Sequence, residues 1–140
     1  METYERRVRE SFARQAMMTT LGAEMSVVRS GSIEIRFPYA ASLTQQHGYL
    51  HAGAVTTALD SACGYAALTV APEGSEVLSV EFKVNLLAPS IGDWIVVRAQ
   101  VKRAGKTLAV CTGDAFAVRP EGEKLVATML ATMIFVPLER

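Results

Sequence analysis

The chain has 140 residues, half of them apolar, and its 14 acidic and 14 basic residues leave no formal net charge at pH 7. This length suits a single domain spanning residues 1–140, with a substantial core that still gains stability from self-association. The balanced charge provides no basic surface of the kind that binds nucleic acid, so we expect no nucleic-acid partner.

The N-terminal segment has the pattern of a short amphipathic helix. Tyr4, Val8 and Phe12 recur at a spacing of four, on a stretch otherwise rich in arginine and glutamate. Those charges stand where a secretory leader would need an apolar stretch, so we expect no leader and a cytoplasmic protein.

Cys63 and Cys111 lack the spacing of a zinc site or a disulfide framework, which indicates core packing in a reducing compartment.

Two strands are expected next. The first covers residues 22–29 and ends in a tight turn around Gly31. In the second, Ile33, Ile35 and Phe37 alternate with charged residues, which is the period of a strand with one face buried.

The stretch GYLHAGAVTTALDSACGYAAL, residues 48–68, is expected to form a long helix of small apolar residues. His51 and the step to Gly53 mark its beginning, and Asp60 is its one carboxylate. A carboxylate inside so apolar a helix is costly unless it is paired, because burial disfavours the charged form. The apolar run is long enough to raise the question of a membrane span, but Asp60 and several threonines interrupt it. We therefore expect a buried helix and no membrane partner.

Four strands are expected after the helix, over residues 77–87, 94–103, 106–118 and 124–136. In the last two, both alternating sets of side chains are apolar. A sheet with one face in water should alternate, and one helix covers only one face. We therefore expect a second copy of the chain against the other face, in a homodimer and further in a homotetramer.

His51 and Asp60 are nine residues apart. On one helix this spacing places them half a turn out of phase and separates them by about 13 Å along the axis. If the two residues cooperate, the histidine of one chain has to face the aspartate of another. This geometry predicts an active site shared between two chains.

Three segments carry a family resemblance: GYLHAGAVTTALD, VLSVEFKVNLLAP and AGKTLAVCTGD. Together they resemble the hotdog-fold acyl-CoA thioesterases of the phenylacetate-degradation (PaaI) type. The resemblance begins near Gly22 and covers most of the chain. It implies an α+β hotdog fold, in which a mainly antiparallel curved sheet wraps around one long central helix, with a short N-terminal helix beside it. It also implies hydrolysis of acyl-CoA thioesters, with coenzyme A entering as part of the substrate and with no cofactor or metal.

The resemblance assigns the chemistry to Asp60, either as the general base that activates water or as the nucleophile. The amides of Ala52 and Gly53 would form an oxyanion hole at the positive end of the helix, and His51 would position the thioester. Gln45 stands where the family often has asparagine, and Ala52 replaces the first glycine of the family's histidine-glycine-glycine pattern. The residues expected near the substrate and coenzyme A are Gly48, Ser79, Val80, Gly105, Lys106 and Thr107.

Ser79 stands where the family has a hydroxyl that orients the carboxylate. Strict alternation groups Ser79 with Glu81 and Lys83, away from the apolar side chains of the same strand. Contact with Asp60 therefore requires either a bulge in this strand or a polar set that faces the helix locally.

Other readings compete with catalysis by Asp60. The carboxylate could be a structural group at a subunit interface. A hotdog dehydratase is a second reading, although such enzymes typically have a proline-glycine turn after the histidine, which is absent here. A non-catalytic acyl-CoA sensor is a third, but it would have no reason to keep a costly aspartate. The acyl group itself is not encoded in any local pattern.

Overall fold

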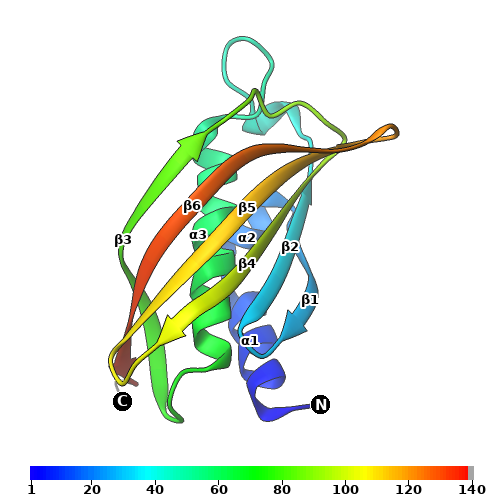
Figure 1. Ribbon diagram of the computed structural model, residues 1–140. Helices are drawn as coiled ribbons and strands as arrows, with labels where there is room; N and C mark the ends of the chain where they lie inside the picture. Colours follow the sequence, from blue (N-terminus) through cyan, green and yellow to red (C-terminus); the bar gives the residue numbers. More distant parts are fainter. Residues whose placement is uncertain (139–140) are drawn as a thin grey trace.

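The computed structural model describes residues 1–138. One antiparallel sheet in the order β1-β2-β4-β5-β6-β3 curves around the long helix α3, and two short N-terminal helices lie beside it (Figure 1). This arrangement confirms the predicted α+β hotdog fold. The elements of this fold are α1 (Thr3–Arg14), α2 (Ala16–Leu21), β1 (Glu24–Arg29), β2 (Ser32–Pro38), η1 (Ala41–Leu43), α3 (Ala52–Thr69), β3 (Ser75–Leu86), β4 (Trp94–Ala104), β5 (Leu108–Arg119) and β6 (Gly122–Pro137).

The N-terminal region contains a second helix that the sequence pattern did not predict. α2 has only six residues, too few to display a helical period. It ends at Gly22, whose φ of 68° lies in the left-handed region that favours glycine after a helix. The first strand consequently begins at Glu24, and the expectation that it starts at Gly22 was wrong.

α3 begins at Ala52 rather than at Gly48, so the expected start was four residues too early. Gly48 has a φ of 83°, which breaks the helical path and places it in the preceding loop. At the other end, the Arg7 guanidinium donates to the carbonyls of Leu68, Ala71 and Pro72. α1 is thereby tied to the last turn of α3 and to the segment that follows it.

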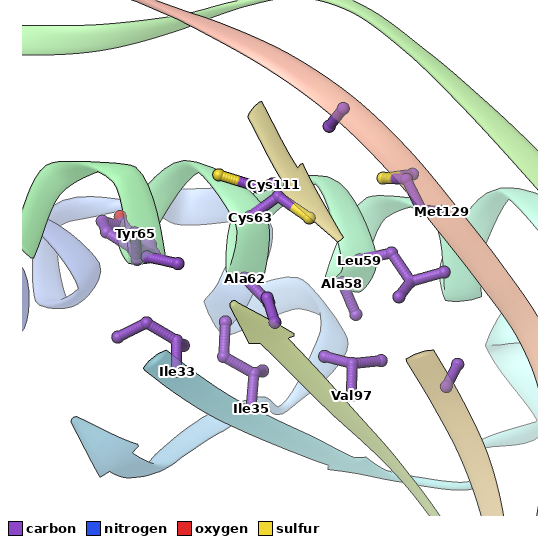
Figure 2. Close-up of a cluster of buried hydrophobic side chains, with 14 of the residues drawn as sticks. Ile33, Ile35, Ala58, Leu59, Ala62, Cys63, Tyr65, Val97, Cys111 and Met129 are labelled. Atoms are coloured by element: carbon purple, nitrogen blue, oxygen red, sulfur yellow. The ribbon is translucent and has the colours of Figure 1, made fainter. Parts of the chain in front are cut away.

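The core lies between α3 and the concave face of the sheet, where small helical residues face aliphatic strand residues (Figure 2). Ala58 and Ala62 are fully buried, as are Ile35 and Val97. Position 113 on β5 favours glycine for a steric reason, since a Cβ there would lie only 3.2 Å from Leu59 Cδ2. Small residues on both sides thus let the helix lie close to the sheet.

Both cysteines belong to this core, as predicted. Cys63 and Cys111 are free thiols and fully buried. Burial raises the pKa of Cys111 to about 11, and it also raises the pKa of Cys63. Neither thiol is available as a thiolate near neutral pH, so both serve packing.

The convex face of the sheet carries exposed apolar side chains. Leu108, Ile134 and Leu78 are register partners across β5, β6 and β3, and Leu108 and Leu78 are 45% and 58% exposed. Leu130 on the same face is 53% exposed. The late strands are thus apolar on both faces: the concave face packs against α3, and the convex face is uncovered in the described chain.

Candidate active site

Asp60 and Ser79 are brought together by a β-bulge. β3 pairs with β6 through Ser79 opposite Met133 and then Glu81 opposite Thr132, which leaves Val80 as the extra residue. The bulge turns Ser79 toward α3, where its Oγ donates a hydrogen bond to Asp60 Oδ1 at 2.6 Å. The sequence allowed contact with Asp60 through either a bulge or a polar set of side chains that faces the helix, and the structure has the bulge.

The pair opens into a pocket of about 390 Å³ between α3, β3 and the junction of α1 with α2. Its wall includes the following residues: Ser11, Arg14, Gln15, Asp60, Ser61, Gly64, Tyr65, Leu68, Glu76, Val77 and Ser79. Asp60 is only half-buried, because its side chain lies on this open side of the helix. Within one chain the carboxylate is therefore not enclosed, and it faces the pocket.

His51 is the N-cap of α3. Its Nδ1 accepts a hydrogen bond from the Gly53 backbone N–H at 2.7 Å, so the neutral ring carries its proton on Nε2. A Cβ at position 53 would lie 3.0 Å from that Nδ1, which explains why glycine stands there. His51 thus presents a single N–H donor outward, on a ring that the helix terminus holds in place.

The two amides predicted to form the oxyanion hole differ in their availability. The Gly53 N–H is already paired with the His51 ring. The Ala52 N–H has no acceptor within residues 1–138, and it lies at the positive end of α3. Of these two groups, Ala52 is the free donor.

Gln45 stabilises the loop before α3. Its Oε1 accepts from the backbone N–H of His47 at 2.5 Å and of Tyr49 at 3.3 Å. Gln45, His51 and Ala52 all border a second pocket of about 490 Å³, which is more apolar and is closed on its other side by Leu86, Leu87 and Pro89. Gly48, predicted near the substrate, lies in the same loop, and its carbonyl accepts from Tyr39 Oη at 3.2 Å.

Within one chain the predicted site residues fall into separate groups. Asp60 and Ser79 border the first pocket, whereas His51, Ala52 and Gln45 border the second. The turn between β4 and β5, with Gly105, Lys106 and Thr107, lies beside the end of β6, at the opposite end of the molecule from the loop that precedes α3 (Figure 1). A single chain does not bring the predicted residues into one site.

The sequence did not predict a polar cluster that lies beside Asp60. Gln15 Oε1 accepts from Ser61 Oγ at 3.0 Å, while Gln15 Nε2 donates to Tyr65 Oη at 2.8 Å. Ser61 and Tyr65 are four residues apart on one helix face. Their partner comes from the α1–α2 junction, which no local pattern links to α3.

No helix within residues 1–138 is both long and apolar enough to span a membrane. In the same residues, no three histidine, cysteine or acidic side chains gather as a group that could hold a metal ion.

Comparison with known proteins places this site in a recognisable context. Residues 47–123 match the family model of the thioesterase superfamily. The solved structure of a thioesterase family protein from Silicibacter pomeroyi is 50% identical to this chain, covers 96% of it and 99% of its own length, and has a TM-score of 0.95. The PaaI protein of the E. coli phenylacetic acid degradation operon shares the fold, with a TM-score of 0.84 at 19% identity over 95% of this chain and 93% of that one.

A curated relative from Halobacterium salinarum, named "Putative esterase", is 29% identical over 67% of this chain. The chain spans 65% of the length of that relative.

Proposed function

Because this chain belongs to the thioesterase superfamily and has the hotdog fold of PaaI-type members, we propose that it hydrolyses acyl-CoA thioesters to a free acid and coenzyme A. The hydrogen bond between Ser79 and Asp60, which fixes a carboxylate at the wall of an open pocket, carries the proposal. Thioester hydrolysis is the chemistry of the superfamily; the acyl-CoA substrate and the residue roles are our assignment.

In this mechanism Asp60 acts as the general base. Ser79 occupies Oδ1, which leaves Oδ2 free to take a proton from water as the water oxygen attacks the thioester carbonyl carbon. The tetrahedral intermediate then collapses, the carbon–sulfur bond breaks, and the proton held by Asp60 passes to the departing thiolate. In the alternative course, Asp60 attacks the carbonyl itself and water hydrolyses the resulting anhydride.

The negative charge that develops on the thioester carbonyl oxygen during the attack has to be stabilised by a hydrogen-bond donor directed at that oxygen. The unpaired Ala52 N–H at the positive end of α3 suits this role, with the outward Nε2–H of His51 beside it. The hydrogen bond from Gly53 to Nδ1 fixes the ring tautomer, so His51 acts as a donor and not as a base.

These donors have to come from a second chain, because they lie in a different pocket from Asp60. β3 pairs only with β6, so its other edge is open in the described chain. Antiparallel pairing of two β3 edges about a twofold axis would place the His51 end of one chain beside the Asp60 end of its partner. The same operation would carry Lys106 and its hairpin toward the partner's loop before α3, where a coenzyme A moiety would lie.

We further propose that two such dimers associate through the convex face of the sheet. Leu78, Leu108 and Leu130 give this face exposed apolar side chains on three adjacent strands. A surface of this kind is typical of protein–protein contacts, and homo-oligomers bury such faces symmetrically.

The direct test is hydrolysis of a panel of short, medium, long and aryl acyl-CoAs, measured by release of free thiol. We expect turnover of at least one acyl class after treatment of the protein with a chelator. Absence of turnover across the panel by folded protein would overturn the proposal. Tight binding of acyl-CoA without turnover would instead identify a sensor or binding module.

A further inference from the structure

We infer that the Gln15–Tyr65–Ser61 cluster is an acyl subsite that selects acyl groups carrying a distal hydroxyl. This inference rests on the proposed function and adds the substrate class. It follows from three features of the first pocket: a weakly paired donor, an uncovered glycine, and the balance of charge.

The first feature is the hydrogen-bond state of Tyr65. This residue is only 7% exposed, and its ring packs edge-on against Phe12. Its hydroxyl oxygen accepts from Gln15 Nε2 at 2.8 Å and from Ser11 Oγ at 3.3 Å. The two hydroxyls can exchange roles, so the Tyr65 proton has Ser11 Oγ as its acceptor, but 3.3 Å is long for an O–H···O bond, and Tyr65 borders the pocket. An oxygen on a ligand, at normal hydrogen-bond distance, would be a better acceptor for this buried donor.

The second feature is Gly64. Glycine inside a helix is less favourable than alanine, and within residues 1–138 a Cβ at this position would meet nothing within 4 Å, so packing inside the described chain does not require glycine here. Gly64 lies on the pocket wall, one helical turn after Asp60. An acyl chain extending from the thioester at Asp60 toward Leu68 would pass directly over this uncovered backbone.

The geometry of α3 sets the length of that chain. Tyr65 lies five residues beyond Asp60, which corresponds to about 7.5 Å along the helix axis. A substrate carbonyl at Asp60 and an oxygen at Tyr65 therefore suit an acyl chain of medium length.

The third feature distinguishes a hydroxyl from a carboxylate. The pocket wall contains two carboxylates, Asp60 and Glu76, against one guanidinium, Arg14. An anionic acyl end would meet more negative than positive charge. A hydroxyl can accept from Tyr65 and donate to the remaining lone pair of Gln15 Oε1, so it satisfies both groups without added charge.

The test compares hexanoyl-CoA, 6-hydroxyhexanoyl-CoA and adipyl-CoA. The wild type should show a kcat/KM for the hydroxylated substrate about three- to tenfold above that for hexanoyl-CoA, the effect of one or two hydrogen bonds. Tyr65→Phe and Gln15→Met should each lower this ratio toward one. Tyr4→Phe is the matched control, because it removes a tyrosine hydroxyl from α1, outside the pocket wall, and should keep the wild-type ratio.

Two further readouts separate recognition from folding. In Asp60→Asn protein, titration calorimetry should show the same preference in Kd. Gly64→Ala should raise the thermal midpoint while it lowers kcat/KM for hexanoyl-CoA more than for acetyl-CoA, because its methyl group lies in the path of the longer chain.

Several results would overturn the inference: equal kcat/KM for the hydroxylated and unsubstituted substrates, preference for adipyl-CoA, or an equal fall for both substrates in Tyr65→Phe. Hydrolysis of hexanoyl-CoA with a ratio of one would refute the subsite and leave the proposed function standing. Failure to hydrolyse or bind any of the three would count against the proposed function as well.

Discussion

Ser79 on β3 donates a hydrogen bond to Asp60 on α3 across 2.6 Å, and a bulge at Val80 makes this contact possible. Without the extra residue, the alternation of β3 would turn Ser79 away from the helix. The bulge therefore positions Ser79 against the carboxylate to which we assign the catalysis; bulges are common near active sites. It also leaves one carboxylate oxygen of Asp60 free for water.

Replacing Ser79 with alanine should lower kcat by about 10- to 100-fold, since a hydrogen bond to a charged group contributes about 1.5–3 kcal/mol. KM should change little, because the contact orients Asp60 and not the acyl group. Steady-state kinetics of Ser79→Ala beside Ser79→Thr provide the measurement, and the threonine variant should recover part of the rate. A Ser79→Ala enzyme with wild-type kcat would show that the bond has no part in catalysis.

Much of the fold could be predicted from local patterns. Ile33, Ile35 and Phe37 alternate strictly, and all three side chains are buried as the strand pattern requires. The long helix and the four strands after it follow from similar local patterns. These signals are local, so the sequence displays them directly.

The features that escaped prediction depend on contacts distant in sequence. The site of the bulge is set by the pairing of β3 with β6, and the link from Gln15 to Tyr65 joins two helices. The His51 ring uses the Gly53 amide, a choice between tautomers that composition does not reveal. The separation of His51 from Asp60, in contrast, was predictable, because helical spacing alone determines it.

Arg7 should stabilise the protein through the end of α3. Arg7→Met removes three hydrogen bonds, one to the Leu68 carbonyl in the last turn of α3 and two, at 3.0 and 3.3 Å, to the carbonyls of Ala71 and Pro72 just after it, while it keeps the aliphatic stem. We expect the free energy of unfolding to fall by about 1–3 kcal/mol in urea titrations. Arg6→Met, which replaces an exposed neighbour, is the control; an equal loss in both variants would contradict a specific role for Arg7.

The cluster of Arg98 with Glu34 and Glu123 should make a pH-dependent contribution to stability. Arg98 donates to Glu34 Oε2 at 2.8 Å and to both oxygens of Glu123 at 2.7 and 2.9 Å. Burial alone would raise the pKa of Glu34, but hydrogen bonds from Ser26 and Arg98 outweigh it and lower that pKa. The bonds from Arg98 also lower the pKa of Glu123.

A carboxylate whose pKa is lower in the folded state stabilises the protein above its unfolded pKa, and this effect disappears as the pH falls through the folded value. The Arg98→Met variant should therefore have a free energy of unfolding about 1 kcal/mol or less below that of the wild type at pH 7, since the side chains are partly exposed. This difference should shrink toward pH 3. Urea unfolding across this range provides the measurement, with the exposed Arg103→Met as control. A difference that grows on acidification would refute this account.

Subunit complementation tests the shared site. His51→Ala chains mixed with Asp60→Asn chains should form mixed dimers that hold one doubly altered and one intact site. After exchange, activity should rise toward about a quarter of the wild-type value, because half of the dimers are mixed and half of their sites are intact. A mass measurement must show that exchange has occurred. Exchange without recovery, or a fully active monomer, would exclude a site built from two chains.

Asp60→Asn examines the role that we propose for Asp60, because asparagine keeps the shape and the contact with Ser79 but cannot take a proton from water or attack the thioester. We expect kcat for the best acyl-CoA of the panel to fall by at least about 10²-fold, as loss of a general base typically causes, with substrate affinity and thermal midpoint retained. A folded Asp60→Asn protein that turns over acyl-CoA at close to the wild-type rate would contradict the mechanism and assign Asp60 a structural role.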